Sequence, residues 1–171
     1  MILSLLSGLE EEEGTKIYSE SFKMLNKLLK IFNEEIFFKT LWDNILNSKN
    51  CRVSGFKFIS NYLQKSKIQL YQPLVVEAIC SCLIDSKVMT QRSVLDMLCN
   101  HFKIENAFEY QDLIKIIYTM TLIIESCDNS VSRRIYQWLF DNTNNTIYFK
   151  ENSLKPFMDS MSVSLIYSKL K

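Results

Sequence analysis

The sequence predicts an all-α fold: a HEAT- or armadillo-like α-solenoid of antiparallel helical hairpins. Only three glycines and two prolines occur in 171 residues, which favours long helices over tight turns. Apolar residues recur at helical spacing, and no stretch shows the alternation that is typical of a strand. One hairpin-like pattern also occurs three times with a period of about 40 residues, as in proteins built from two-helix repeats.

The repeat is clearest around residues 82–102. One helix is expected to end near Ile84, a polar corner follows at 85–87, and a second helix runs over 88–102. Residues 47–63 and 127–140 show the same order of polar corner, one or two arginines and a bulky apolar stripe. Three sets of large residues place the copies in register: Phe56 with Leu95 and Tyr136, Phe58 with Met97 and Trp138, and Ile59 with Leu98 and Leu139.

The first two long helices are predicted at 15–32 and 34–46, and Thr15 is expected to cap the first of them. The residues expected on the buried side of helix 15–32 are Ile17, Met24, Leu25, Leu28 and Phe32. The residues expected on the buried side of helix 34–46 are Ile36, Phe37, Leu41, Trp42 and Ile45.

The third helix is predicted at 51–64 and contains Gly55. A glycine inside a helix costs about 1 kcal/mol relative to alanine, so we expect a neighbouring helix to approach closely there. Pro73 fits the first turn of the next helix. The remaining helices are expected at 112–125, 131–140 and 147–171, with connections at 65–72, 106–110 and 141–145.

Length and composition are those of one folded domain over 1–171, with 47% hydrophobic and 23% charged residues. The net charge of +1 argues against a nucleic-acid-binding protein, since such proteins are usually strongly basic. No apolar run approaches the roughly 18 residues of a membrane span, and the N-terminus lacks the pattern of a secretory signal. A cytoplasmic location is therefore expected, with all five cysteines reduced.

No pattern of catalytic residues emerges. The single histidine, His101, has no nearby partner at helical spacing except Glu105. No glycine-rich phosphate loop and no spacing of metal ligands is present. The acidic run 10–13 is explained by a solvated loop or by a docking patch for a basic partner. We therefore expect no enzyme, and no catalytic, cofactor-binding or metal-binding residues.

Arginines near the start of each second helix are the most specific polar feature. Together with Gln91 they form a candidate partner-binding edge, whose members are Arg52, Gln91, Arg92, Arg133 and Arg134. In one interpretation they form a structural ladder, in which each arginine reaches a corner aspartate such as Asp85 or Asp128, or a carbonyl. In the other, they line a groove that recognises acidic peptides or phosphoinositides. We favour the ladder.

Helix 15–32 also carries a basic edge, formed by Lys16, Lys23, Lys27 and Lys30. Such an edge is either a solvated face or a lipid-facing surface, in which each lysine near an anionic membrane contributes about 1 kcal/mol.

Several short motifs, in order, resemble the N-terminal region of the Dopey proteins. They are GLEEE at 8–12, Leu41-Trp42, VEAIC at 76–80 ahead of LIDS at 83–86, Gln91-Arg92 and RRIYQWL at 133–139. The resemblance covers roughly residues 5–149 and lies in the ordered set rather than in any single motif. Gly55 departs from it, because alanine or a similar residue is expected there.

The resemblance implies a role that the residues alone do not. Dopey proteins are large cytosolic scaffolds, peripheral to Golgi and endosomal membranes, that act in traffic between these compartments. The partners implied are an Arf-exchange-factor-like protein, an aminophospholipid flippase and conventional kinesin. Phosphoinositide-bearing membranes are also implied. Family members are much longer, so this chain is expected to be a segment of a longer N-terminal solenoid.

The function expected is a non-enzymatic protein-interaction scaffold in membrane traffic between endosomes and Golgi. The alternatives are a phosphoinositide- or membrane-binding helical module, and a general helical-repeat adaptor unrelated to Golgi traffic.

Overall fold

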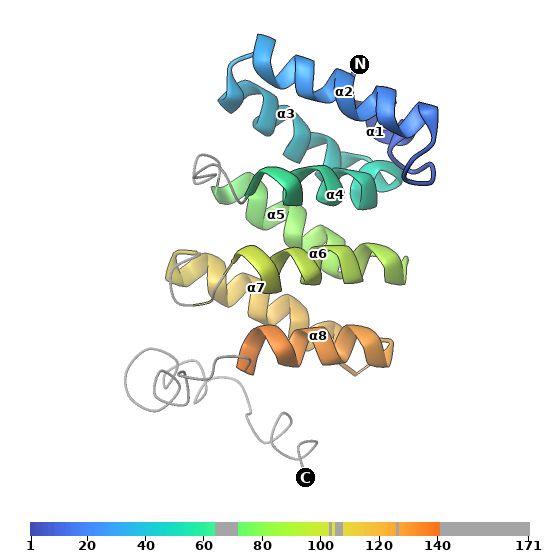
Figure 1. Cartoon of the computed structure of the whole chain (residues 1–171). Coiled ribbons are helices and arrows are strands. Elements are labelled where there is room, and N and C mark those ends of the chain that lie inside the picture. Colours follow the sequence, from blue (N-terminus) through green and yellow to red (C-terminus); the bar gives the residue numbers. More distant parts are fainter. Residues whose placement is uncertain (64–71, 103, 105–107, 126, 141–171) are drawn as a thin grey trace. The chain divides into compact units, whose positions relative to one another are not determined.

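The computed structural model describes residues 1–63, 72–102, 104, 108–125 and 127–140, and all regular secondary structure in these ranges is helical (Figure 1). The predicted all-α class is confirmed. The elements of the described part are α1 (Ile2–Gly8), α2 (Lys16–Ile31), α3 (Glu34–Asn47), the 3₁₀ turn η1 (Lys49–Cys51), α4 (Arg52–Leu63), α5 (Gln72–Leu83), α6 (Val88–His101), α7 (Tyr110–Ile123) and α8 (Asn129–Phe140).

Helix boundaries lie close to those predicted, because local capping chemistry sets them. The backbone N–H of Tyr18 donates to Thr15 Oγ1 at 3.2 Å, which confirms Thr15 as the cap of α2. Asn33 caps α3 by accepting from the N–H of Glu35 at 2.9 Å. A side chain also accepts a backbone N–H at the corner before α6, where Asp85 Oδ1 accepts from Lys87 N at 2.8 Å. The helix predicted at 147–171 and the loop at 141–145 lie outside the described residues.

The chain divides into two compact units, Met1–Trp138 and Leu139–Lys171. Within the first unit the helices form two layers (Figure 1). One layer holds α3, α5 and α7, with α5 packed between the other two, and in the other layer α4 packs against α6. Successive antiparallel hairpins are thereby stacked along the unit. A single domain over 1–171 stays a prediction.

The core of the first unit is rich in aromatic residues near its N-terminal end. Phe58 lies at the centre, with ring centroids 5.7 Å from Phe22, 5.9 Å from Phe37 and 4.9 Å from Tyr62. Burial of Phe37 and Phe58, which are at most 1% exposed, contributes about 2 kcal/mol each. Most of the residues placed in register by the sequence are buried: Phe56, Phe58, Ile59, Leu95, Met97, Leu98 and Trp138. Tyr136 and Leu139 are half-buried.

Gly55 lies where α4 packs closely against Ile45 of α3, which confirms the predicted close approach of a neighbouring helix. A Cβ atom added to Gly55 would lie 2.7 Å from Ile45 Cγ1 and 2.8 Å from Ile45 Cδ1. These distances are shorter than van der Waals contact, so any larger residue would displace Ile45 or the helix.

Four predicted core residues are instead exposed, and these predictions were wrong. Ile17, Met24 and Phe32 are 58%, 51% and 45% exposed, and Ile36 is 57% exposed. For Ile17 and Met24 the cause is that α2 carries two apolar stripes, whereas Phe32 and Ile36 lie at the turn between α2 and α3. The stripe that contains the fully buried Leu25 packs inward, which turns Ile17 and Met24 outward.

Candidate functional site

Arg52, at the start of α4, lies inside the protein and uses all five of its N–H donors. Its Nε donates to Ile45 O at 3.0 Å and one Nη2 bond reaches Leu46 O at 3.0 Å, both in the last turn of α3. The remaining donors reach Ser81 O, Ser81 Oγ and Asp85 Oδ2 at 3.2, 2.6 and 2.5 Å. Arg52 therefore joins the C-terminal end of α3 to that of α5 and to the next corner.

Arg92 repeats this connection one hairpin later, at the protein surface. Its Nη2 lies 3.1 Å from Asp128 Oδ1 in the corner before α8. The two side chains are 35% and 44% exposed, so the pair is solvated and contributes little stability. The ladder interpretation thus describes the contacts of Arg52 and Arg92, with Asp85 and Asp128 as the corner aspartates.

Arg134 adds a connection that the sequence analysis missed. Its Nε donates to Asp96 Oδ1 at 2.6 Å, and its Nη1 donates to Ser130 O at 3.0 Å. Asp96 was not among the candidate residues, although it stands four residues after Arg92 on the exposed side of α6. That spacing places it beside Arg92 on one helix face and was the available signal.

Gln91 and Arg133, the other two members of the candidate edge, differ in burial and in hydrogen bonding. Gln91 is half-buried, and its Nε2 donates to Leu83 O at 2.9 Å, which caps the end of α5. Arg133 is exposed, and no side-chain partner for it exists within the ranges the structure describes. Arg52 is only 4% exposed and belongs to the interior. Of the predicted edge, Arg133 is the member with an exposed and available guanidinium, and a role in partner binding stays a prediction.

Asp128, the partner of Arg92, accepts hydrogen bonds that stabilise its ionised form. Hydrogen bonds from the Ser130 side chain and backbone, together with Arg92, lower the pKa of Asp128 to about 2. The Ser130 N–H donates to Asp128 Oδ1 at 2.9 Å, and the Ser130 hydroxyl also donates to this oxygen. The carboxylate is therefore ionised at neutral pH and organises the first turn of α8.

All four lysines of the predicted basic edge are exposed on α2. Lys16 Nζ lies 3.9 Å from Glu20 Oε1, which is a solvated pair one turn apart. Lys23, Lys27 and Lys30 form no ion pair in the described part of the chain. The structure thus brings the four lysines together along one helix, beside the exposed Ile17 and Met24.

The remaining candidates carry no recognisable chemistry. His101 is half-buried at the end of α6, and burial lowers the pKa of its imidazole. No group of three or more potential metal ligands occurs in the part of the chain that the structure describes. Glu10 to Glu13 are exposed, and Glu13 lies 3.9 Å from Lys57 Nζ.

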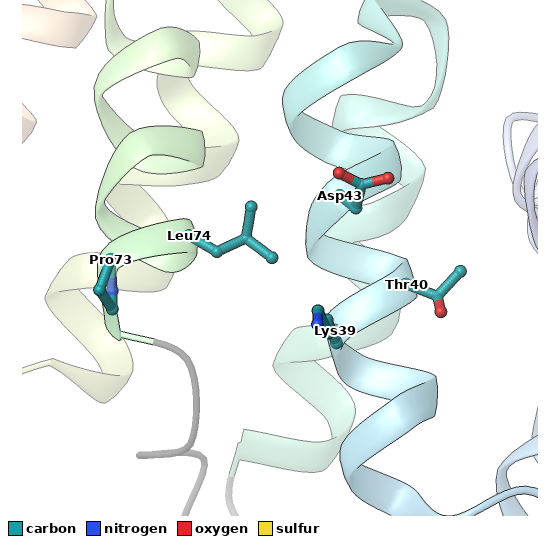
Figure 2. Close-up of a pocket in the computed structure, with 5 residues that line it drawn as sticks. All are labelled: Lys39, Thr40, Asp43, Pro73 and Leu74. Carbon is teal, nitrogen blue, oxygen red and sulfur yellow. The ribbon is translucent and has the colours of Figure 1, made fainter.

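A cavity of ≈ 420 Å³ lies between α3 and α5 (Figure 2). It is lined by Lys39, Thr40, Asp43, Pro73 and Leu74, and Leu74 points from α5 toward α3. The Thr40 hydroxyl already donates to Ile36 O at 2.8 Å. The lining of the cavity therefore combines one lysine and one carboxylate with an apolar floor formed by Pro73 and Leu74.

Among the described helices, none has both the length and the apolar character that crossing a membrane requires.

Comparisons with known proteins give the family. The family model "Dopey, N-terminal" matches residues 1–144. Protein DOP1B of Mus musculus is 27% identical over 180 residues, which cover 94% of this chain and 8% of that protein. Protein pad-1 of Caenorhabditis elegans is 27% identical over 79% of this chain and 6% of its own length. Protein dop1 of Emericella nidulans is 22% identical over 81% of this chain and 10% of its length.

No solved structure matches the chain. The chain spans a tenth or less of the length of these three relatives. Because the family model covers most of the chain, the resemblance seen in the sequence is confirmed: the chain belongs to the Dopey family and corresponds to its N-terminal region.

Proposed function

We propose that this chain is a non-enzymatic protein-interaction scaffold that acts in membrane traffic between endosomes and Golgi. The observation that carries the proposal is the match to the Dopey N-terminal region over residues 1–144. None of the three relatives' names states a reaction. The proposed location is cytoplasmic, at the periphery of Golgi and endosomal membranes.

The packing of the described helices supports a binding role. Stacked hairpins present broad surfaces, and the affinity of such surfaces usually depends on a few anchor residues. The contacts of Arg52 with α3, α5 and Asp85 hold neighbouring hairpins together. A surface held in this way is preorganised, so partner binding costs less conformational entropy.

The test is affinity capture of the tagged 171-residue chain from cytosol and from detergent extract, with partners identified by mass spectrometry. The expected partners are an Arf-exchange-factor-like protein, an aminophospholipid flippase or a kinesin. Arg133→Glu is the edge variant, because it changes an exposed guanidinium without breaking an ion pair seen in the described part. Lys115→Glu on the exposed side of α7 is the matched charge reversal.

Capture of one of these proteins by the wild type and by Lys115→Glu, with loss in Arg133→Glu, would support the proposal and identify the edge. Capture that is equal in both variants would support the scaffold but place its binding face elsewhere. If none of the three classes is enriched, the remaining candidate is a helical-repeat adaptor unrelated to Golgi traffic.

Binding to an anionic or phosphoinositide-containing membrane is the second candidate, because Lys16, Lys23, Lys27 and Lys30 are all exposed on α2. Sedimentation with phosphoinositide-containing vesicles tests it. Binding through these lysines should weaken as salt rises, since salt screens exposed charges.

A further inference from the structure

The outer side of α2 combines an apolar stripe with a basic edge. Ile17, Met24 and Ile31 recur every seven residues and are 58%, 51% and 75% exposed. Residues seven apart lie nearly above one another on a helix, so these three side chains form one line about 20 Å long. Single exposed apolar residues are ordinary on protein surfaces, but an aligned set marks a contact surface.

The order of the buried side, the apolar stripe and the lysine edge around α2 indicates what kind of partner the stripe contacts. Helical spacing of about 100° per residue places the exposed apolar stripe between the buried side, which contains Leu25, and the lysine edge. Exposed Glu20, which pairs with Lys16, and then the lysines flank the stripe on one side only, and the protein core flanks it on the other. A helix adsorbed to a membrane usually has basic residues on both flanks of its apolar face. The arrangement on α2 instead matches the edge of a helical layer, where one further helix packs beside α2.

The other helices show what such a neighbour looks like. Phe22 of α2 lies 5.7 Å from Phe58 of α4, and α4 in turn packs against α6. Helix α4 thus has a helical neighbour on each side. Its exposed positions are polar, among them Lys57 and Asn61. Helix α2 has α4 on one side and the short helix α1 on another, where Gly8 lies close to Ser21 and Ile17, and beyond α1 the apolar stripe of α2 faces solvent in the described structure.

The charges around α2 help to distinguish a membrane from a protein helix as the partner of the exposed stripe. Residues 10–36 contain seven glutamates and four lysines, so this end of the described unit is net acidic. Glu10 to Glu13 precede α2, and Glu34 and Glu35 follow it, all of them exposed. The net acidic charge of this end weakens its attraction for an extended anionic membrane, although Glu13 itself lies beside Lys57 of α4. A single helix with acidic residues along one edge would contact the lysines and avoid both acidic ends.

We propose that the outer face of α2 is a docking site for an amphipathic helix of a second protein, whose apolar stripe is bordered by acidic residues. The apolar stripe of that helix packs on Ile17, Met24 and Ile31, and its carboxylates face Lys23, Lys27 and Lys30. Helix-on-helix docking of this kind anchors through residues three and four apart on the incoming helix. The proposal names the partner chemistry of the scaffold and rests on the proposed protein-binding function, although not on the membrane compartment.

The test uses the whole 171-residue chain and two labelled, helix-stabilised peptides of about 18 residues, long enough to cover the stripe. Both carry the same leucine stripe, which is bordered by glutamate in one peptide and by lysine in the other. Fluorescence anisotropy measures binding. We expect the glutamate-bordered peptide to bind at least about tenfold more tightly, because three ion pairs replace three repulsions.

Two variants with matched controls locate the site. The triple variant Lys23→Glu, Lys27→Glu, Lys30→Glu should reverse the preference, so that the lysine-bordered peptide binds more tightly. Met24→Glu should weaken both peptides by about tenfold or more, because it places a charge in the apolar contact. Lys115→Glu and Met89→Glu, both at exposed positions, should change neither affinity. Circular dichroism establishes that each variant is folded.

Absence of binding by the glutamate-bordered peptide would overturn the proposal, as would equal binding of both peptides or an unchanged preference in the triple variant. Binding to phosphatidylserine vesicles that disappears in the triple variant, without peptide binding, would assign the face to membranes instead. If the peptides fail but affinity capture still finds a trafficking protein, the scaffold function stands and only the docking face is wrong.

Discussion

The Arg52 guanidinium and the Asp85 carboxylate form an ion pair at 2.5 Å between α4 and the corner after α5, with side chains 4% and 0% exposed. Thirty-three residues of chain separate the two. Both charges are buried and Arg52 has no unused donor, so the pair joins neighbouring hairpins without leaving a guanidinium N–H unsatisfied. A buried pair of this kind is costly to break from one side, since the remaining charge stays without its counter-ion.

Asp85→Ala should therefore lower the free energy of unfolding by about 3–5 kcal/mol, measured by urea denaturation. Asp128→Ala is the matched variant, because it removes a corner aspartate from a solvated arginine pair. The loss expected for Asp128→Ala is clearly smaller, because its carboxylate is solvated and its partner Arg92 remains in contact with water. Equal losses in the two variants would contradict the difference in burial.

Asp128 should contribute to the loss of folding stability at acidic pH. Its folded pKa, at about 2, lies below the ordinary value of 3.8, so its stabilising contribution is present above pH 4 and is lost as the pH falls from about 4 to 2. NMR titration of the carboxyl group in wild type and in Ser130→Ala measures this. Ser130→Ala should raise the pKa of Asp128, because the hydroxyl bond that stabilises the carboxylate is removed. An unchanged pKa would assign the shift to the backbone and Arg92.

Gly55→Ala should destabilise the chain, although alanine is the better helix former. Helix propensity favours alanine by about 1 kcal/mol, whereas crowding against a packed core costs about 1–3 kcal/mol. The short distances to Ile45 indicate that crowding prevails, for a net loss of about 1–2 kcal/mol. Combining Gly55→Ala with Ile45→Ala should cost less than the sum of the two single changes, because alanine lacks both the Cγ1 and the Cδ1 atom that the added Cβ would meet. Additive losses in this double-mutant cycle would mean that Gly55 and Ile45 are not in conflict.

The rate at which each cysteine is alkylated should depend on how deeply its side chain is buried. Burial raises the pKa of the Cys82 thiol to about 12, and burial also raises the pKa of Cys51. Both side chains are at most 1% exposed, so at neutral pH they hold almost no reactive thiolate. With iodoacetamide and mass spectrometry, Cys127, which is half-buried, should be modified well before Cys51 and Cys82. Early modification of Cys82 in the folded chain would mean that the hairpins open readily.

Elements governed by local chemistry could be predicted from the sequence. The helix that begins at Val88 and the cap at Thr15 depend on residues a few positions apart, and both were predicted correctly. The close approach at Gly55 was also predicted, because glycine weakens a helix and is favoured inside one where a neighbouring helix leaves no room for a Cβ atom. These features follow from backbone chemistry within one or two helical turns.

The choice between two apolar stripes on α2 could not be predicted. Ile17 and Met24 have the same spacing and hydrophobicity as a core stripe, yet Leu25 faces inward and they do not. The hydrophobic pattern specifies that a helix buries one side. Which side is buried depends on the shape and volume of the helices that pack against it.

The sequence by itself determined an all-α chain of repeated hairpins with arginines at the corners, because helical periodicity and the spacing of polar corners are local properties. Only the tertiary structure decided that Arg52 is enclosed whereas Arg133 faces solvent, and that the lysine edge of α2 borders an exposed apolar stripe. The physical reason is that burial and the pairing of charges depend on neighbours brought together from distant parts of the chain. No pattern within one helix contains that information.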